Sequence, residues 1–247
     1  MRKVQLTPWL WGAAGVVALL ALGASEPLSP AGWSAALGYL AVSSLLVSRG
    51  LRRRGSVRFG AANAVTAARS MLVGVATGLV VTSFTDRISP ALLVTIVATA
   101  LALDGVDGYV ARRTGSVSEL GARFDMEVDA FLLLVLSVYD ARFVGGWVLA
   151  IGVMRYAFVA AAWALPFLGR RLPSRYWRKV VAAACGIALA LIAAQPLPPV
   201  ANVVVAAGAL LLLCESFGRD VVWLVWMNRT SSHLVSPQKA PARDGSR

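Results

Sequence analysis

The sequence predicts an all-α integral membrane protein, and three observations lead to that prediction. Of the 247 residues, 58% are hydrophobic and only 15% are charged, which leaves too little polar surface for a water-soluble globule. The mean hydropathy is +0.70. The apolar residues also gather into runs close to the roughly 20 residues that a helix needs to cross a bilayer.

Eight of these apolar runs are predicted to be membrane-spanning helices, and prolines punctuate several of the connections between them. The segment VVWLVW at 221–226 is too short to span, and we expect it to lie as a helix at the membrane interface, anchored by Trp223 and Trp226. The polar tail from Thr230 is predicted to be disordered. The expected spans cover about 8–24, 31–48, 63–84, 90–111, 121–139, 144–167, 177–195 and 198–217.

The basic residues predict how these spans are oriented. If the N-terminus is cytoplasmic, 20 of the 24 Lys and Arg residues lie on the cytoplasmic side. Only Arg87 and Arg142 fall on the other side, and two more arginines lie within spans. Since positive charge favours cytoplasmic loops, we expect a multi-pass protein of the cell membrane with both termini in the cytoplasm. The same loops, which attract anionic lipid headgroups, explain the net charge of +12, and no nucleic-acid-binding motif accompanies it.

Four aspartates interrupt or border two of the apolar runs. Asp104 and Asp107 are spaced i,i+3, and Asp125 and Asp129 are spaced i,i+4, so each pair lies on one face of its helix. Carboxylates inside a membrane protein are costly and mark a functional site by default. Four carboxylates that converge repel one another, and an all-oxygen cluster suits Mg²⁺, Mn²⁺ or Ca²⁺.

The two aspartate pairs are expected to face each other near the cytoplasmic surface. The connection 113–120 between their helices is short, which makes the helices antiparallel neighbours. The small residues Gly108 and Ala111 continue the stripe of Asp104 and leave room for a ligand near the backbone. Arg112 and its neighbour Arg113 suit phosphate oxygens. The pattern therefore predicts a metal-assisted diphosphate site.

The whole pattern resembles the signature of the CDP-alcohol phosphotransferases, which make phospholipids from CDP-linked lipids or alcohols. Its eight fixed positions span 26 residues: Asp104-x2-Asp107-Gly108-x2-Ala111-Arg112-x8-Gly121-x3-Asp125-x3-Asp129. Upstream, Asn63-x2-Thr66-x2-Arg69 is similar to the polar start of the family's first core helix. The resemblance implies a six-helix catalytic core over residues 63–218. It leaves two extra N-terminal spans in residues 1–62, and an interfacial segment and tail in residues 219–247.

The resemblance also implies roles for individual residues. Asp104, Asp107 and Asp125 resemble the family's metal-binding aspartates. Asp129 resembles the general base and counts among the metal ligands as well. The positions associated with the CDP moiety are Asn63, Ala64, Val65, Thr66, Gly108, Ala111, Arg112, Ser118 and Gly121.

The implied reaction is attack by an alcohol on a CDP-linked donor, with Mg²⁺ or Mn²⁺ as cofactor and CMP as leaving group. CDP-diacylglycerol is the expected donor, because a site between helices admits lipid tails sideways. Arg69 and Arg155, both within spans, are candidates to bind an acceptor phosphate such as that of glycerol 3-phosphate or inositol phosphate. Arg155 could equally neutralise an acid, and Glu127 is expected to pair with a cation on a neighbouring helix. Family members are commonly homodimers, which we expect here too.

Other functions remain open at this level. The same fold could use a soluble CDP-alcohol donor with a lipid acceptor. A divalent-metal transporter could also use four carboxylates, although their place at the ends of spans and the glycines and arginine around them argue against it. A non-catalytic scaffold would not need the intact motif. The sequence does not predict which alcohol is the acceptor.

Overall fold

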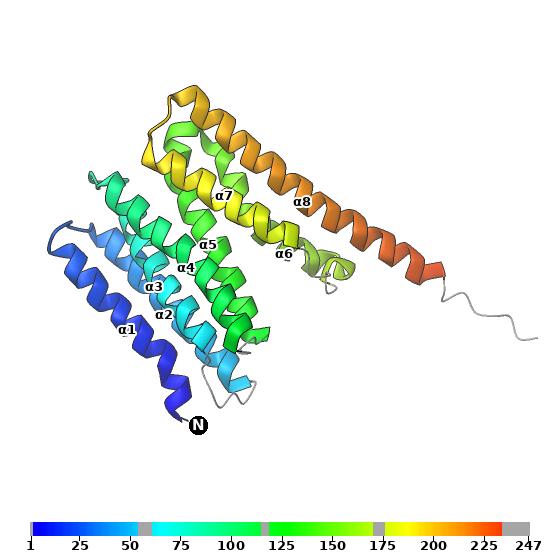
Figure 1. Ribbon diagram of the computed structural model, residues 1–247, viewed down its shortest axis with the longest axis horizontal. Coiled ribbons are helices and arrows are strands. Elements are labelled where there is room, and N and C mark those ends of the chain that lie inside the picture. Colours follow the sequence, from blue (N-terminus) through cyan, green and yellow to red (C-terminus); the bar gives the residue numbers. More distant parts are fainter. Residues whose placement is uncertain (1, 54–60, 115–118, 170–175, 234–247) are drawn as a thin grey trace, which may run out of the picture.

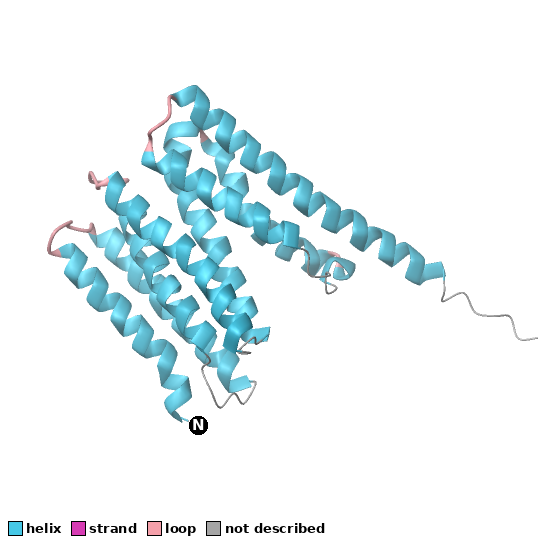
Figure 2. Ribbon diagram, in the orientation of Figure 1, coloured by secondary structure: helices cyan, strands magenta, loops and turns pink. Residues whose placement is uncertain are grey.

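The computed structural model describes residues 2–53, 61–114, 119–169 and 176–233. Across these ranges the chain forms α-helices and two short 3-10 helices, with no strand, which confirms the predicted all-α class (Figures 1 and 2). The helices are α1 (Arg2–Gly23), α2 (Pro30–Arg53), α3 (Ala61–Thr82), α4 (Pro90–Thr114), α5 (Glu119–Val144), α6 (Leu149–Ala164), α7 (Tyr176–Ala194) and α8 (Pro199–His233).

Helix starts follow from local sequence. Helices α2, α4 and α8 each begin at a proline, whose fixed φ suits the first helical position and whose missing N–H costs nothing there. The serines before two of these prolines act as caps. Ser29 Oγ accepts a hydrogen bond from the N–H of Gly32 at 3.1 Å, and Ser89 Oγ accepts one from Leu92 at 3.3 Å.

Helices α3 and α5 lie at the centre of the bundle. Helix α3 packs against α1, α2, α4 and α5, and α5 also packs against α6, α7 and α8. The N-terminus lies at the same end of the bundle as the C-terminal end of α4 and the N-terminal end of α5 (Figure 1). Side chains on α3 and α5 can therefore contact several neighbouring helices at once.

Among the described residues, six helices are long and apolar enough to cross a membrane. All eight expected spans are helical, but the two that carry the aspartates are not among these six. In α4 the side chains are described without a gap only over the apolar stretch Pro90–Val106, and α5 carries several charged residues along its length.

The C-terminal segment differs from the expectation of a separate interfacial helix at 221–226. The segment is helical, but α8 continues through it without a break from Pro199 to His233. Two contacts to α7 hold this part: Trp177 Nε1 donates to Glu215 Oε2 at 2.9 Å, and Arg178 pairs with Asp220 at 3.4 Å. The tail was expected to be disordered from Thr230, but α8 continues through 230–233; the rest of the tail falls outside the described residues.

Candidate active site

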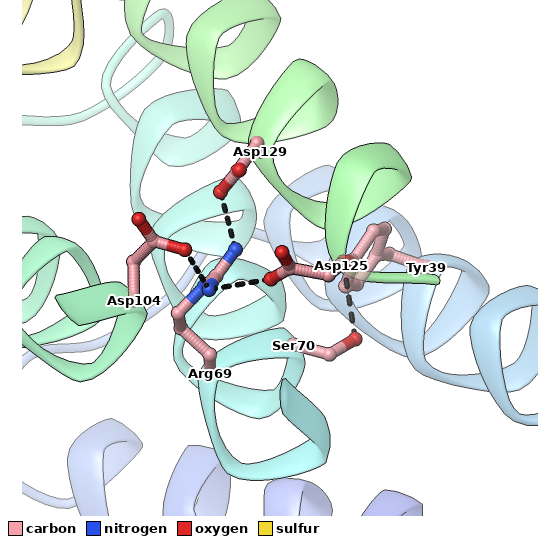
Figure 3. Close-up of polar contacts among 6 residues, drawn as sticks. All are labelled: Tyr39, Arg69, Ser70, Asp104, Asp125 and Asp129. Carbon is pink, nitrogen blue, oxygen red and sulfur yellow. Dashed lines mark hydrogen bonds and ion pairs between the residues drawn. The ribbon is translucent and has the colours of Figure 1, made fainter. Parts of the chain in front are cut away.

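An arginine on α3 lies at the centre of the site (Figure 3). Arg69 Nη1 donates to Asp104 Oδ1 at 2.6 Å and to Asp125 Oδ1 at 2.8 Å, and Nη2 donates to Asp129 Oδ1. The Arg69 side chain is only 1% exposed. A guanidinium suits this position because its planar fork of donors can serve several carboxylates at once and stays charged when buried.

The three carboxylates come from two helices. Asp104 lies on α4, and Asp125 and Asp129 lie one helical turn apart on α5. One oxygen from each side chain lies within 4.8 Å of the others. The side chain of Asp104 is 41% exposed, that of Asp125 32% and that of Asp129 33%. A ligand can therefore reach the carboxylates while the arginine beneath them stays buried.

The donor set fits a divalent cation. Three carboxylates carry three negative charges, and the one guanidinium that pairs with all of them offsets a single charge. Hard oxygen donors that converge with excess negative charge are the ligands that Mg²⁺ and Mn²⁺ prefer. Asp104, Asp125 and Asp129 would hold such an ion, and Asp107 lies one turn along α4, where its side chain falls outside the described part of the structure.

The remaining nucleotide-binding candidates fall into two groups. Asn63 and Thr66 are buried on α3, 7% and 2% exposed, on the same helix as Arg69, and Ala64 and Val65 lie between them. Gly121 opens α5 one turn before Asp125. The other candidates cannot be placed as side chains: Gly108, Ala111 and Arg112 lie on α4 with their side chains outside the described residues, and Ser118 lies wholly outside them.

Arg155 lies in a separate group between α6 and α5. Its Nη2 pairs with Glu127, and its Nη1 lies 3.0 Å from the sulfur of Met126. The expected pairing of Glu127 with a cation on a neighbouring helix is therefore confirmed. Glu127 follows Asp125 by two residues, which turns it away from the face that carries the carboxylate cluster.

Two residues at the site had no place among the sequence predictions. Ser70 Oγ lies 3.1 Å from the hydroxyl of Tyr39, which reaches it from α2 (Figure 3). A signal for Ser70 does exist in the sequence, because Asn63, Thr66 and Ser70 are spaced i,i+3,i+7 on one face of α3. For Tyr39 no such pattern exists, since its partner is 31 residues away on another helix.

Comparison with known proteins gives one match. A family model described as CDP-alcohol phosphatidyltransferase matches residues 59–214, which is more than half of the chain and runs from the start of α3 into α8. Helices α1 and α2 precede the matched region. No curated protein and no solved structure matches the chain significantly.

Proposed function

Because the chain belongs to the CDP-alcohol phosphatidyltransferase family, we propose that it transfers a phosphatidyl group from CDP-diacylglycerol to the hydroxyl of an alcohol acceptor and releases CMP. The observation that supports this most is the convergence of Asp104, Asp125 and Asp129, three residues of the family signature, on one buried arginine. A diphosphate donor needs such a site, where charge can be balanced around the reacting phosphate.

In this proposal Asp104, Asp107, Asp125 and Asp129 would hold one or two divalent cations. A cation bound there would offset the charge of the diphosphate and of the departing CMP. Arg69 fixes the relative positions of the carboxylates on α4 and α5, because its two terminal nitrogens bind all three described aspartates. Prior positioning of this kind removes much of the cost of assembling a charged transition state.

Asp129 is the proposed general base. The acceptor oxygen attacks the β-phosphorus of the donor, Asp129 takes the hydroxyl proton, and the bond from that phosphorus to the oxygen shared with CMP breaks. Asp129 suits this role because it lies one turn from Asp125 and is partly exposed, so a hydroxyl can approach it. The hydrogen bond from Arg69 orients its carboxylate.

We propose a phosphorylated acceptor, such as glycerol 3-phosphate or inositol phosphate. The support is Arg155, whose buried Nε has no hydrogen-bond partner among the described residues although Nη1 and Nη2 are engaged. The side chain is 27% exposed, so a phosphate can approach the guanidinium beside these contacts, whereas Nε itself is closed off. Arg69 is less suited to a direct contact with the acceptor, because its guanidinium is buried under the carboxylates.

The location that we propose is the cell membrane, with both termini and the site on the cytoplasmic side and with a homodimer as the working unit. The support for this orientation is the basic character of the loops at that end of the bundle. Family membership argues against the metal-transporter alternative. The use of a soluble CDP-alcohol with a lipid acceptor is the competing substrate assignment within the family.

Removal of metal tests the carboxylate site. With purified protein, CDP-diacylglycerol and a panel of acceptors, we expect CMP release that falls to background in excess EDTA and returns with added Mg²⁺ or Mn²⁺. The panel holds glycerol 3-phosphate, inositol phosphate, inositol, serine and a second phospholipid. Binding of CDP-diacylglycerol that is indifferent to the chelator, together with unchanged CMP release, would refute the metal assignment.

Exchange of Arg155 tests the acceptor assignment. We expect Arg155→Gln to raise the KM of a phosphorylated acceptor about tenfold and to leave the KM of the donor unchanged, since a lost charged contact costs on the order of 1.4 kcal/mol or more. The double variant Arg155→Gln/Glu127→Gln separates the two roles of this arginine. If Arg155 only neutralises Glu127, the double variant recovers the wild-type KM; if it binds the acceptor phosphate, the KM stays high.

A further inference from the structure

Tyr39 of α2 joins the two helices that carry the central arginine and two of its carboxylates. Its hydroxyl lies 3.1 Å from Ser70 Oγ, directly after Arg69 on α3. Its ring stacks on Phe131 of α5, with ring centroids 4.5 Å apart and planes inclined by 22°. Phe131 follows Asp129 by two residues. Figure 3 shows the tyrosine with its hydroxyl directed to Ser70.

Helix α2 is held firmly against α3 on one side of this tyrosine. A Cβ at Gly32 would lie 2.1 Å from Thr82 Oγ1 and 2.6 Å from the carbonyl oxygen of Gly78, so only glycine permits this approach. The N–H of Ser29 donates to Thr82 Oγ1 at 3.1 Å. These contacts fix the position of α2 along the axis of α3, and with it the position of Tyr39.

On the other side of Tyr39 a small cavity lies between the helices. This cavity has a volume of about 20 Å³, and residues of α1 line it together with Ser43 and Ser44 of α2, Ser70 of α3 and Phe124 of α5. Ser70 lines this cavity, and its side chain is hydrogen-bonded to the tyrosine hydroxyl.

We infer that Tyr39 is a positioning residue for the transferase site, which holds α3 and α5 in the register that brings Arg69 to Asp125 and Asp129. The inference rests on the proposed function. It also assigns a role to α2, which precedes the region 59–214 that the family model covers. Carboxylates that must meet one guanidinium and one cation tolerate displacements of only about half an ångström, so support from neighbouring residues matters.

A double-mutant cycle tests this role. The variants are Tyr39→Phe, Ser70→Ala and the pair, and Tyr139→Phe is the matched control because it removes the same hydroxyl at the far end of α5. Two readouts are taken: kcat for CMP release, and affinity for Mn²⁺ measured by electron paramagnetic resonance without substrates. We expect each single variant to lower kcat about fivefold and to weaken Mn²⁺ binding about threefold, with the KM of the donor nearly unchanged.

Coupling decides the outcome. If the hydroxyl pair positions the site, the double variant is no worse than either single variant in both readouts. Tyr39→Phe with wild-type kcat and wild-type Mn²⁺ affinity, or two losses that simply multiply, would overturn the inference. Coupled losses of Mn²⁺ affinity in a chain that releases no CMP would uphold the positioning role and refute the proposed reaction. A chain that binds no Mn²⁺ would overturn both.

Discussion

Replacement of Asp129 by Asn is expected to lower kcat about 1,000-fold, because the acceptor hydroxyl loses the base that takes its proton. Binding of CDP-diacylglycerol should stay within about threefold of wild type. The guanidinium of Arg69 keeps its hydrogen bonds to Asp104 and Asp125, so the rest of the site stays assembled. The measurement is CMP release under saturating donor, together with donor affinity by equilibrium binding.

The matched control for this variant is Asp140→Asn. Asp140 lies on the same helix, 11 residues further on and thus about 16 Å away by helical rise. It is fully buried, and neither carboxylate oxygen has a hydrogen-bond partner in the described part of the chain. The same chemical change should leave kcat unaltered there. Near-normal turnover of Asp129→Asn across the acceptor panel would show that another group is the base.

Replacement of Arg69 by Lys is expected to lower kcat/KM at least about 100-fold. A lysine keeps the charge but is a single point donor, so it cannot bind carboxylates from α4 and α5 through two nitrogens as the guanidinium does. Arg69→Gln should also destabilise the protein, by about 3–5 kcal/mol, because it leaves three partly buried carboxylates without their cation. Kinetics and thermal unfolding in detergent measure the two effects.

Arg142→Lys controls for the exchange of an arginine that makes polar contacts away from the site. Arg142 lies near the other end of α5, where it donates to the carbonyl oxygen of Ser83 at 2.6 Å and lies over the ring of Tyr139. The variant Arg142→Lys should change kcat/KM less than twofold. Wild-type kcat/KM in Arg69→Lys would mean that the guanidinium fork does not organise the site.

The grouping of the aspartates could be predicted because it follows from local geometry. Helical spacing puts Asp125 and Asp129 on one face, and a short connection makes α4 and α5 antiparallel neighbours. The continuity of α8 was harder to predict, because Arg219 and Asp220 interrupt its apolar run in the way that the end of a membrane span does. In the structure these charges are accommodated, Asp220 by Arg178 and Arg219 by Glu215 one turn earlier.

The central place of Arg69 could not be predicted from the sequence. An arginine in a span signals a polar partner, but three helices must reach their final rotation before Asp104 and Asp129 can share it. Those rotations depend on close approaches such as that of Gly32 to α3 and of Gly152, whose Cβ would lie 2.5 Å from the Cα of Leu134. No periodic pattern encodes such contacts, and Tyr39 was missed for the same reason.

The most direct test of phosphatidyl transfer is identification of the lipid product. The purified protein would be incubated with CDP-diacylglycerol, Mg²⁺ and isotopically labelled acceptors from the panel, and the lipids would be analysed by mass spectrometry. We predict a new phospholipid that carries the label of one acceptor, formed in equal amount to CMP and absent with Asp129→Asn. Label that enters lipid only from a soluble CDP-alcohol, or CMP release without any labelled lipid, would contradict the account.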